Sequence, residues 1–369
     1  MISPKRTSNT FLLCLLGMMA IINSCLVIFP KLYLVLNIAG VLLLFSYYIL
    51  ANGGIAKVQD VLIAILAAVL IVAWQDATKI SLFVAFLFWQ TSTLYEKSST
   101  KLYRNILLAA FVCVVIAYCF GFNRQYDRLN WSPSQQMYLR ERPLGFINAN
   151  RCMLFVFVIS CMMLMGAEKV WQYLLIALAN GILYQFTKSR TFLYVLLMVV
   201  GALCLLKVFK CEKTVSAFGK SIPWVYLALF AFSILLPYFF AGTRLDQIFT
   251  GRLGTNKAFL QSGITWFGNS ALENTTFDSA YLHMLLTKGV VFLVLFTGIF
   301  FYCCKKATIT NKGAVMLCAV LVAGFMEVIF LDSNILFLMG IAMHSGREKE
   351  ENYANQEDPL LLVRRQSQV

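Results

Sequence analysis

The feature that most constrains this sequence is a series of long apolar segments that recurs along almost the whole chain. About 12 of them approach the roughly 20 residues that a membrane-crossing helix needs. The third and the last are short enough to be re-entrant. Because the apolar runs are continuous, they predict helices and not the alternating strands of a membrane barrel. The segments lie at approximately 10–29, 32–50, 61–74, 80–95, 106–121, 152–166, 170–187, 191–209, 222–240, 280–302, 313–331 and 334–345.

Composition supports a membrane protein. Charged residues make up only 13% of the chain, whereas soluble domains contain about 25%, which argues against a soluble enzyme. We therefore expect an all-α fold, a polytopic transmembrane helical bundle of about 12 spans formed by residues 1–345. Residues 346–369 are polar and mixed in charge, which predicts a disordered cytoplasmic tail. The N-terminus resembles a signal peptide, but it lacks a small-residue cleavage site, so we interpret it as the first span.

The distribution of positive charge predicts the orientation. The formal net charge is +14, from 31 Lys and Arg against 17 Asp and Glu. If both termini are cytoplasmic, 18 Lys and Arg lie on the cytoplasmic side and 12 outside, as the positive-inside rule requires. This orientation places two long loops, 122–151 and 241–279, outside the cytoplasm. No basic helix, zinc-finger spacing or aromatic RNA-binding box is present, so no nucleic-acid partner is expected.

Metal ligands are scarce in this sequence. Most of the 11 cysteines lie inside apolar runs, where they act as small hydrophobic residues. With only two histidines and no CxxC pair, a structural zinc site is not expected. The outer loops also lack the paired acidic ligands of a DxD motif. We therefore expect neither a metal nor a cofactor.

Arginines dominate the cations of the two long loops. Seven of the eight are Arg, whereas the cytoplasmic side is dominated by Lys. Arginine binds phosphate through a planar fork, so the set predicts an anionic, phosphorylated ligand. For any one of these residues, contact with lipid headgroups is an equally good interpretation. The eight cations are Arg124, Arg128, Arg140, Arg142, Arg151, Arg244, Arg252 and Lys257.

Two motifs place polar residues where a span begins. In the segment 142–151, Arg142 is followed by Asn148, Asn150 and Arg151 at the start of the sixth span, where a helix N-terminus favours an anion. Helix capping by an Asn is the simpler role. In the tight turn 187–191, Lys188 and Arg190 lie close to the apolar phase, where cations need partners, and this favours an anion site.

A third group of polar residues occupies the second long loop. Arg244 and Arg252 belong to it, and Glu273, Asp278 and Tyr281 precede or open the tenth span. Positions 278, 281 and 285 would share one helical face, although Asp278 could also cap the helix. His283 would lie near the outer interface, where a hydrogen-bonded structural role is more common than a catalytic one.

These motifs together resemble the bacterial polysaccharide repeat-unit polymerases of the Wzy type, which act in O-antigen, capsule and exopolysaccharide synthesis and are related to O-antigen ligases. The sequence departs from the family pattern at Asn148-Ala149, where a His-Pro pair is usual. Ligases tend to have His-Asn-x-Tyr or His-Asn-x-Phe where this chain has Asp-Ser-Ala-Tyr, which favours a polymerase. The matching segments are Gly145-Phe146-Ile147-Asn148-Ala149-Asn150, Ser189-Arg190-Thr191, Gly251-Arg252 with Phe267-Gly268, and Asp278-Ser279-Ala280-Tyr281-Leu282 with Gly289.

The resemblance implies a multi-pass glycosyltransferase of the bacterial cytoplasmic (inner) membrane. Its substrate would be a polyprenyl-pyrophosphate (undecaprenyl-type) oligosaccharide on the outer face, and a flippase and a chain-length regulator would act in the same pathway. Arginine donors would stabilise the leaving pyrophosphate, with Arg190 and Arg252 as the first candidates, and Asp278 would act as the base. The expected substrate-binding residues are Arg142, Asn148, Asn150, Arg151, Lys188, Arg244, Glu273, Tyr281 and His283.

Two other functions remain open. An O-antigen ligase would transfer the same glycan to a different acceptor. A flippase or transporter of lipid-linked oligosaccharides would also need an arginine-lined cavity, but its charges should lie within the spans and its halves should be related. No such internal repeat is visible in the sequence.

Overall fold

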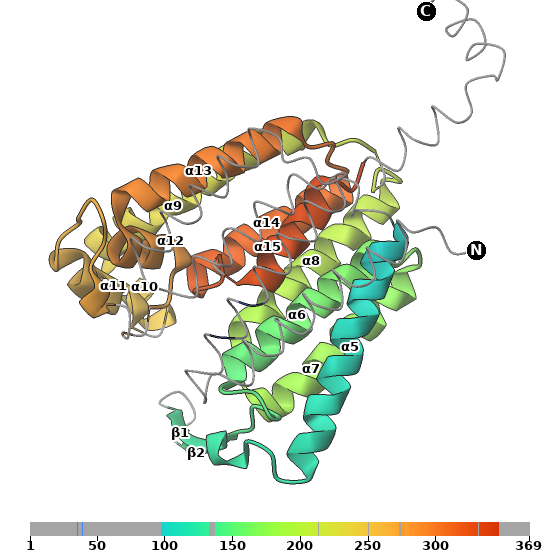
Figure 1. Cartoon of the computed structure of the whole chain (residues 1–369), viewed down its shortest axis with the longest axis horizontal. Coiled ribbons are helices and arrows are strands. Elements are labelled where there is room, and N and C mark those ends of the chain that lie inside the picture. The colour runs from blue at the N-terminus through green and yellow to red at the C-terminus, as the bar shows by residue number, and fades with distance from the viewer. Residues whose placement is uncertain are drawn as a thin grey trace, which may run out of the picture.

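A computed structural model describes residues 97–346, except 133–136, 213, 250, 273–274, 276 and 331, together with the isolated helical residues Val35 and Ala39 (Figure 1). Apart from Val35 and Ala39, the first four expected spans lie outside the described residues, as does the tail from residue 347 onward. Within that range, each of the eight remaining expected segments contains a helix. The long helices are α5 (Lys97–Cys119), α6 (Ala149–Gly166), α7 (Val170–Thr187), α8 (Arg190–Val208), α9 (Ile222–Phe240), α13 (Gly289–Lys306), α14 (Asn311–Met326) and α15 (Ser333–Met343).

Shorter elements fill the connections between these helices. The segment expected as one span at 280–302 lies within one helical stretch, Ala280–Lys306, that is long and apolar enough to cross a bilayer. This stretch contains α12 (Ala280–His283), the π-helical turn η5 (Met284–Lys288) and α13. The other short elements are β1 (Arg128–Ser132), β2 (Met137–Glu141), α10 (Arg244–Ile248), α11 (Arg252–Gln261), and the 3-10 turns η2 (Arg124–Tyr126), η3 (Ala217–Ser221) and η4 (Ser270–Leu272).

The described helices are apolar enough for a membrane. Five helical stretches are long and apolar enough to cross a bilayer, and α14 and α15 are shorter apolar helices. Their outward faces carry large apolar side chains, such as Ile116, Leu178 and Met198, which are more than half exposed. Such surfaces are unfavourable in water and favourable in lipid. The fold is thus a mostly helical bundle of the membrane type, and the full count of 12 spans remains a prediction.

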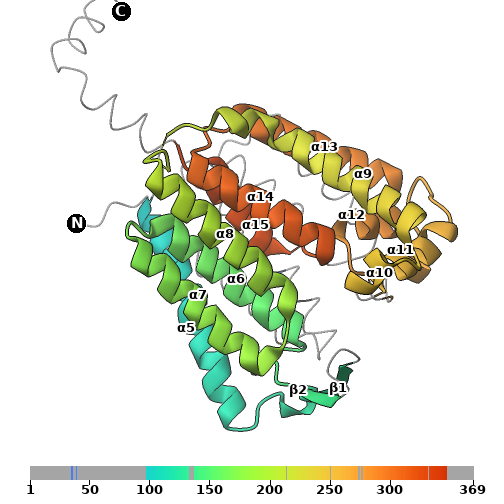
Figure 2. The ribbon, with the colours of Figure 1, turned by 180° about the vertical axis from the view of Figure 1, so that it is seen from behind.

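Helix α14 lies at the centre of the bundle. It packs against α8, α9 and α15, and α15 also packs against α6. Figures 1 and 2 show α9 and α13 on one side of α14 and α15, and α6, α7 and α8 on the other, with α5 at the edge. Most of α6, α14 and α15 is buried, whereas most of α5 and α9 is not. The central helices therefore form a scaffold for the groups at their ends.

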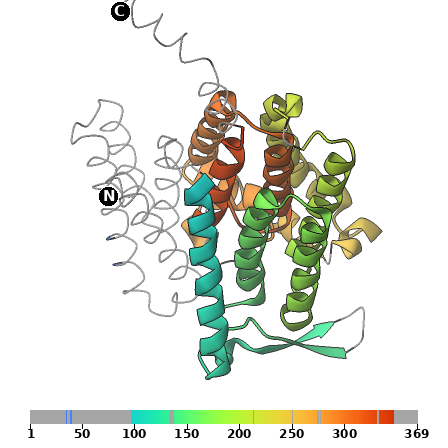
Figure 3. The ribbon, with the colours of Figure 1, turned by 90° about the vertical axis from the view of Figure 1, so that its right-hand side faces the viewer.

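Loop 122–151 contains a β-hairpin. Strands β1 and β2 pair antiparallel with Arg128 opposite Glu141, and the hairpin projects from the bundle near the end of α5 (Figure 3). Arg140 forms an ion pair with Asp127 at 3.3 Å. These strands were not predicted from the sequence, because the apolar-run pattern that indicates spans carries no signal for a polar hairpin.

The break between α12 and α13 has a clear physical cause. The loop before it supplies backbone partners: Asn269 N donates to Leu286 O at 2.9 Å, and Val291 N donates to Trp266 O at 3.1 Å. Gly268 and Gly289 face each other closely, so a Cβ on either would collide with the backbone of the other segment. Both have positive φ, which glycine adopts without a steric cost. The motif glycines therefore close this loop onto the broken helix.

The other end of the bundle is held by a buried charged cluster. Glu212 pairs with Lys207 at 2.9 Å and accepts a hydrogen bond from Tyr173 Oη at 3.1 Å. Lys312 Nζ donates to Ala167 O at 2.6 Å and lies 3.4 Å from Tyr173 Oη. These contacts tie the ends of α6, α7, α8 and α14 together, because buried charges are tolerated when they are paired.

Candidate functional site

The two long loops and the turn 187–191 meet at one end of the bundle. Arg142 N donates to Phe186 O at 2.9 Å, which joins the first loop to the end of α7. Ser189 Oγ donates to Asn150 Oδ1 at 2.8 Å, which joins the start of α8 to the start of α6. The second loop reaches the same end through Arg252. The three polar motifs of the sequence are therefore neighbours in space.

A buried carboxylate, Glu327, lies at the centre of this end. It caps the C-terminus of α14, and its side chain is 10% exposed. Asn150 Nδ2 donates to its Oε1 at 3.2 Å and to its Oε2 at 3.1 Å, and Thr191 Oγ1 donates to Oε1 at 3.0 Å. The first turns of α6 and α8 thus hold this carboxylate from two directions.

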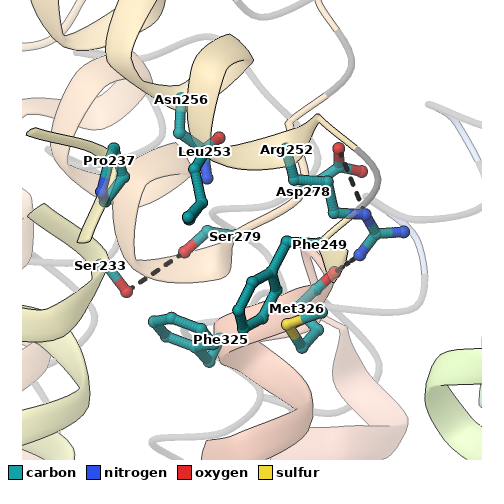
Figure 4. Close-up of a pocket in the computed structure, with 10 residues that line it drawn as sticks. All are labelled: Ser233, Pro237, Phe249, Arg252, Leu253, Asn256, Asp278, Ser279, Phe325 and Met326. Atoms are coloured by element: carbon teal, nitrogen blue, oxygen red, sulfur yellow. Dashed lines mark hydrogen bonds and ion pairs between the residues drawn. The ribbon is translucent and has the colours of Figure 1, made fainter. Parts of the chain in front are cut away.

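Arg252 contacts three groups with three different nitrogens. Its Nη1 donates to Met326 O at 2.6 Å, at the end of α14. Its Nη2 lies 3.5 Å from Glu327 Oε1, and its Nε lies 3.6 Å from Asp278 Oδ2. A helix C-terminus carries partial negative charge, so it attracts a guanidinium. Arg252 therefore bridges the end of α14 and the segment that leads into α12 (Figure 4).

The local sequence around Arg252 positions it at the first residue of α11. Gly251 has φ +79° and lets the chain turn sharply into the helix. Asp246 accepts hydrogen bonds from Leu253 N and Gly254 N, and from Gly242 N on the other side. A carboxylate at a helix N-terminus stabilises the first turn. Asp246 thus has a structural role that accounts for its place in the motif.

Asp278 is the more exposed of the two carboxylates on Arg252. Its side chain is 32% exposed, and its carboxylate forms an ion pair with Arg252. It precedes α12 by two residues, and Ser279 is the N-cap residue. The alternative that Asp278 caps the helix is therefore wrong, because the helix begins one residue too late for it.

The pocket beside this ion pair is small. Ser233, Phe249, Asn256 and Phe325 contribute to its lining together with Arg252 and Asp278 (Figure 4). Its free space is about 10 Å³, which is at the lower limit for one water molecule. A sugar or a diphosphate would therefore require the second loop to move away from the end of α14.

The electrostatics of the site place one cation between two carboxylates. Arg252 lies 3.5 Å from the buried Glu327 carboxylate and 3.6 Å from the more exposed Asp278 carboxylate. Asn150 and Thr191 add hydrogen bonds to Glu327. The carboxylate is therefore kept in place by specific donors, since burial alone would favour its neutral form.

Other candidate residues of the first loop have structural partners. Asn148 is the N-cap of α6, where its Oδ1 accepts from Arg151 N at 2.7 Å, as the capping alternative expected. Arg151 Nη1 forms an ion pair with Asp332 at 3.0 Å. Arg124 donates to the last carbonyls of α5, Tyr118 O and Cys119 O. With Arg140, three of the loop arginines are thus paired within the protein.

The candidates on α12 lie inside the bundle. Tyr281 is fully buried, and its Oη donates to Leu321 O at 3.2 Å. A contact between its hydroxyl and a sugar is not available in this arrangement, because aromatic side chains surround it. His283 is buried with its ring 5.5 Å from that of Phe277. Glu273 lies outside the described residues.

The remaining candidate cations lie at the surface of the same end. Lys188 Nζ donates to Gln185 Oε1 at 3.1 Å and lies over the Tyr184 ring. Arg190 and Arg244 are exposed, and Arg142 is half-buried. Within the described part of the chain, none of these three arginines has a side-chain hydrogen bond or ion pair. They remain available to an anion.

The residue that sequence reasoning missed is Glu327. It lies in the apolar segment expected at 313–331, and acidic residues are rare in such segments and are often functional. The rarity of acidic residues in such segments was the signal that could have identified Glu327.

Among the described residues, no group of three or more His, Cys, Asp or Glu could hold a metal ion. No family model, curated protein or solved structure matches this chain.

Proposed function

We propose that this protein is a membrane glycosyltransferase that polymerises polyprenyl-pyrophosphate-linked oligosaccharide repeat units on the outer face of the cytoplasmic membrane. One observation carries the proposal. The guanidinium of Arg252 lies next to the carboxylate of Asp278 at the end of an apolar bundle where all three polar motifs meet. A cation for a diphosphate and a base for a hydroxyl are the two groups that this reaction needs.

The proposed reaction is a glycosyl transfer. The bond between C1 of the growing glycan and the diphosphate oxygen breaks, and its electron pair leaves with the polyprenyl diphosphate. The hydroxyl oxygen of the next unit forms the new bond to C1, and Asp278 accepts its proton. Arg252 stabilises the negative charge that develops on the diphosphate. Arg190, exposed at the start of α8, is the second donor.

The apolar part of the substrate would lie along the helices. A groove of about 330 Å³ runs along α8 and α14, from Val195 and Val322 to Phe218 of η3 and Asn311 at the opposite end of the bundle. Its walls are almost entirely apolar and include Val195, Met198 and Val322. Such a surface favours an isoprenoid chain over a polar ligand.

The test is a reaction of the purified protein with one lipid-linked repeat unit and no other acceptor. A ladder of products supports the polymerase. A product that forms only when a second glycan acceptor is added supports a ligase, and transbilayer movement without reaction supports a flippase. The Arg252→Ala and Arg190→Ala variants should stay in the membrane and form no ladder. If both variants make normal polymer, the arginine mechanism is wrong.

A further inference from the structure

Arg252 has two carboxylate partners whose surroundings differ. Glu327 is almost fully buried and accepts three hydrogen bonds from Asn150 and Thr191, whereas Asp278 is a third exposed and forms an ion pair with Arg252. Arg252 Nη2 approaches Glu327, and the neighbouring Nη1 donates a hydrogen bond to Met326 O. Two of the three contacts of Arg252 are therefore made with the fixed end of α14.

We propose that Glu327 is a positioning residue that keeps Arg252 at the end of α14, whereas Asp278 is an exchangeable partner that yields its place on Arg252 to the diphosphate of the substrate. This division of roles rests on the proposed function. It accounts for the small free space beside the ion pair, because the Asp278 carboxylate already lies 3.6 Å from Arg252 Nε.

The two ion-pair distances are nearly equal, 3.5 Å to Glu327 and 3.6 Å to Asp278, and both exceed the usual hydrogen-bond range. The division therefore rests on burial and on the hydrogen bonds that Glu327 accepts, since solvent weakens an ion pair whose carboxylate is a third exposed. Replacing it with a diphosphate gives Arg252 an anion of higher charge and frees Asp278 to accept a proton. Moving Glu327 would instead break its bonds to α6 and α8, which leaves a buried carboxylate without donors.

The same geometry gives a role to two of the sequence motifs. Asn150 and Thr191 act through Glu327, and Ser189 orients the Asn150 amide by donating to its Oδ1. The Asn-rich start of α6 and the Ser-Arg-Thr turn before α8 thus position Arg252 without touching it.

The test measures binding of geranylgeranyl diphosphate to the full chain in lipid nanodiscs, with geranylgeraniol as the control that lacks phosphate. Simple electrostatics predicts that removing either carboxylate tightens anion binding. The proposal predicts opposite signs: Asp278→Asn tightens binding, and Glu327→Gln weakens it by about tenfold, the loss expected from one charge-assisted contact.

Two further variants make the test specific. Thr191→Val removes a donor to Glu327 and changes no charge, so a loss of affinity there reports positioning alone. Glu212→Gln removes an equally buried carboxylate at the opposite end and should bind as the wild type does. Melting temperatures are measured in parallel. If Glu327→Gln does not fold, Thr191→Val decides, and wild-type affinity in that variant overturns the proposal.

The outcomes separate this inference from the proposed function. If Arg252→Ala binds the diphosphate as tightly as the wild type, the anion site itself is wrong. If Arg252→Ala loses binding but Glu327→Gln binds as tightly as or more tightly than the wild type, the anion site stands and the positioning role of Glu327 is wrong.

Discussion

One substitution of Arg252 can separate the contribution of its positive charge from that of its planar guanidinium geometry. Its three contacts use three nitrogens that only a planar guanidinium can present together. We expect Arg252→Lys to keep the positive charge and still lower product formation by about tenfold or more, since it loses at least one charge-assisted hydrogen bond. The measurement is the initial rate of ladder formation. Arg128→Lys is the control, because Arg128 is exposed and lies in β1, far from Arg252 in the sequence. Equal rates for Arg252→Lys and the wild type would mean that charge alone suffices.

Individual residues also show how much of the site the sequence could predict. The polar motifs pointed to Asn150, Arg252 and Asp278, because polar groups beside long apolar runs are conspicuous. The same reasoning placed Arg124 and Arg140 in the set of loop cations that predicts a phosphorylated ligand. In the structure, Arg124 donates to carbonyls of α5, and Arg140 forms an ion pair with Asp127. These partners depend on the three-dimensional conformation of the loop, which the hydropathy and charge pattern of the sequence does not predict. Glu327 was missed because hydropathy averages over its neighbours.

At the scale of the element, the broken helix α12–η5–α13 depends on two glycines. Gly289 has φ +86° and ψ 176°, a region essentially restricted to glycine, and a Cβ there would meet the backbone of Trp266 and Phe267. We expect Gly289→Ala to lower the free energy of unfolding by about 1–3 kcal/mol or more, seen as a lower melting temperature in detergent. Gly298→Ala, in the regular part of α13, meets no atom within 4 Å and should be neutral or slightly stabilising. A Gly289→Ala protein as stable as Gly298→Ala would contradict the packing described.

The helices themselves were predictable for a simple reason. A segment that crosses lipid must satisfy its own backbone groups, so length and apolarity nearly determine its structure. The break at η5 was not predictable, because it depends on backbone partners from residues 265–269. The β-hairpin was missed for the same reason, since its pairing is set by the loop and not by the spans.

At the scale of the whole molecule, each end of the bundle has its own charged cluster: one carboxylate with two lysines around Glu212, and one arginine with two carboxylates around Arg252. Burial would raise the pKa of Glu212, but the hydrogen bonds from Lys207 and Tyr173 and the charge of Lys312 outweigh it and hold the pKa below its ordinary value. The ionised form therefore stabilises the fold above the ordinary pKa, and this contribution is lost as pH falls through the lowered value. We expect melting temperature to fall on the acid side in the wild type, and Glu212→Gln to start lower and to lack that part of the decline. Parallel pH profiles for the two proteins would contradict this assignment.

The orientation of the whole bundle decides whether the Arg252 end can meet a lipid-linked glycan. Both long loops lie at that end, and the Glu212 cluster lies at the other. Single cysteines at the exposed positions Arg128 and Gln247 should react with a membrane-impermeant maleimide in intact cells, once any outer membrane is permeabilised. Cysteines at Lys210 and Lys305, exposed at the opposite end, should react only after lysis. Labelling of the unsubstituted chain gives the background. The reverse pattern would place Arg252 in the cytoplasm, where a polymerase of exported repeat units has no substrate.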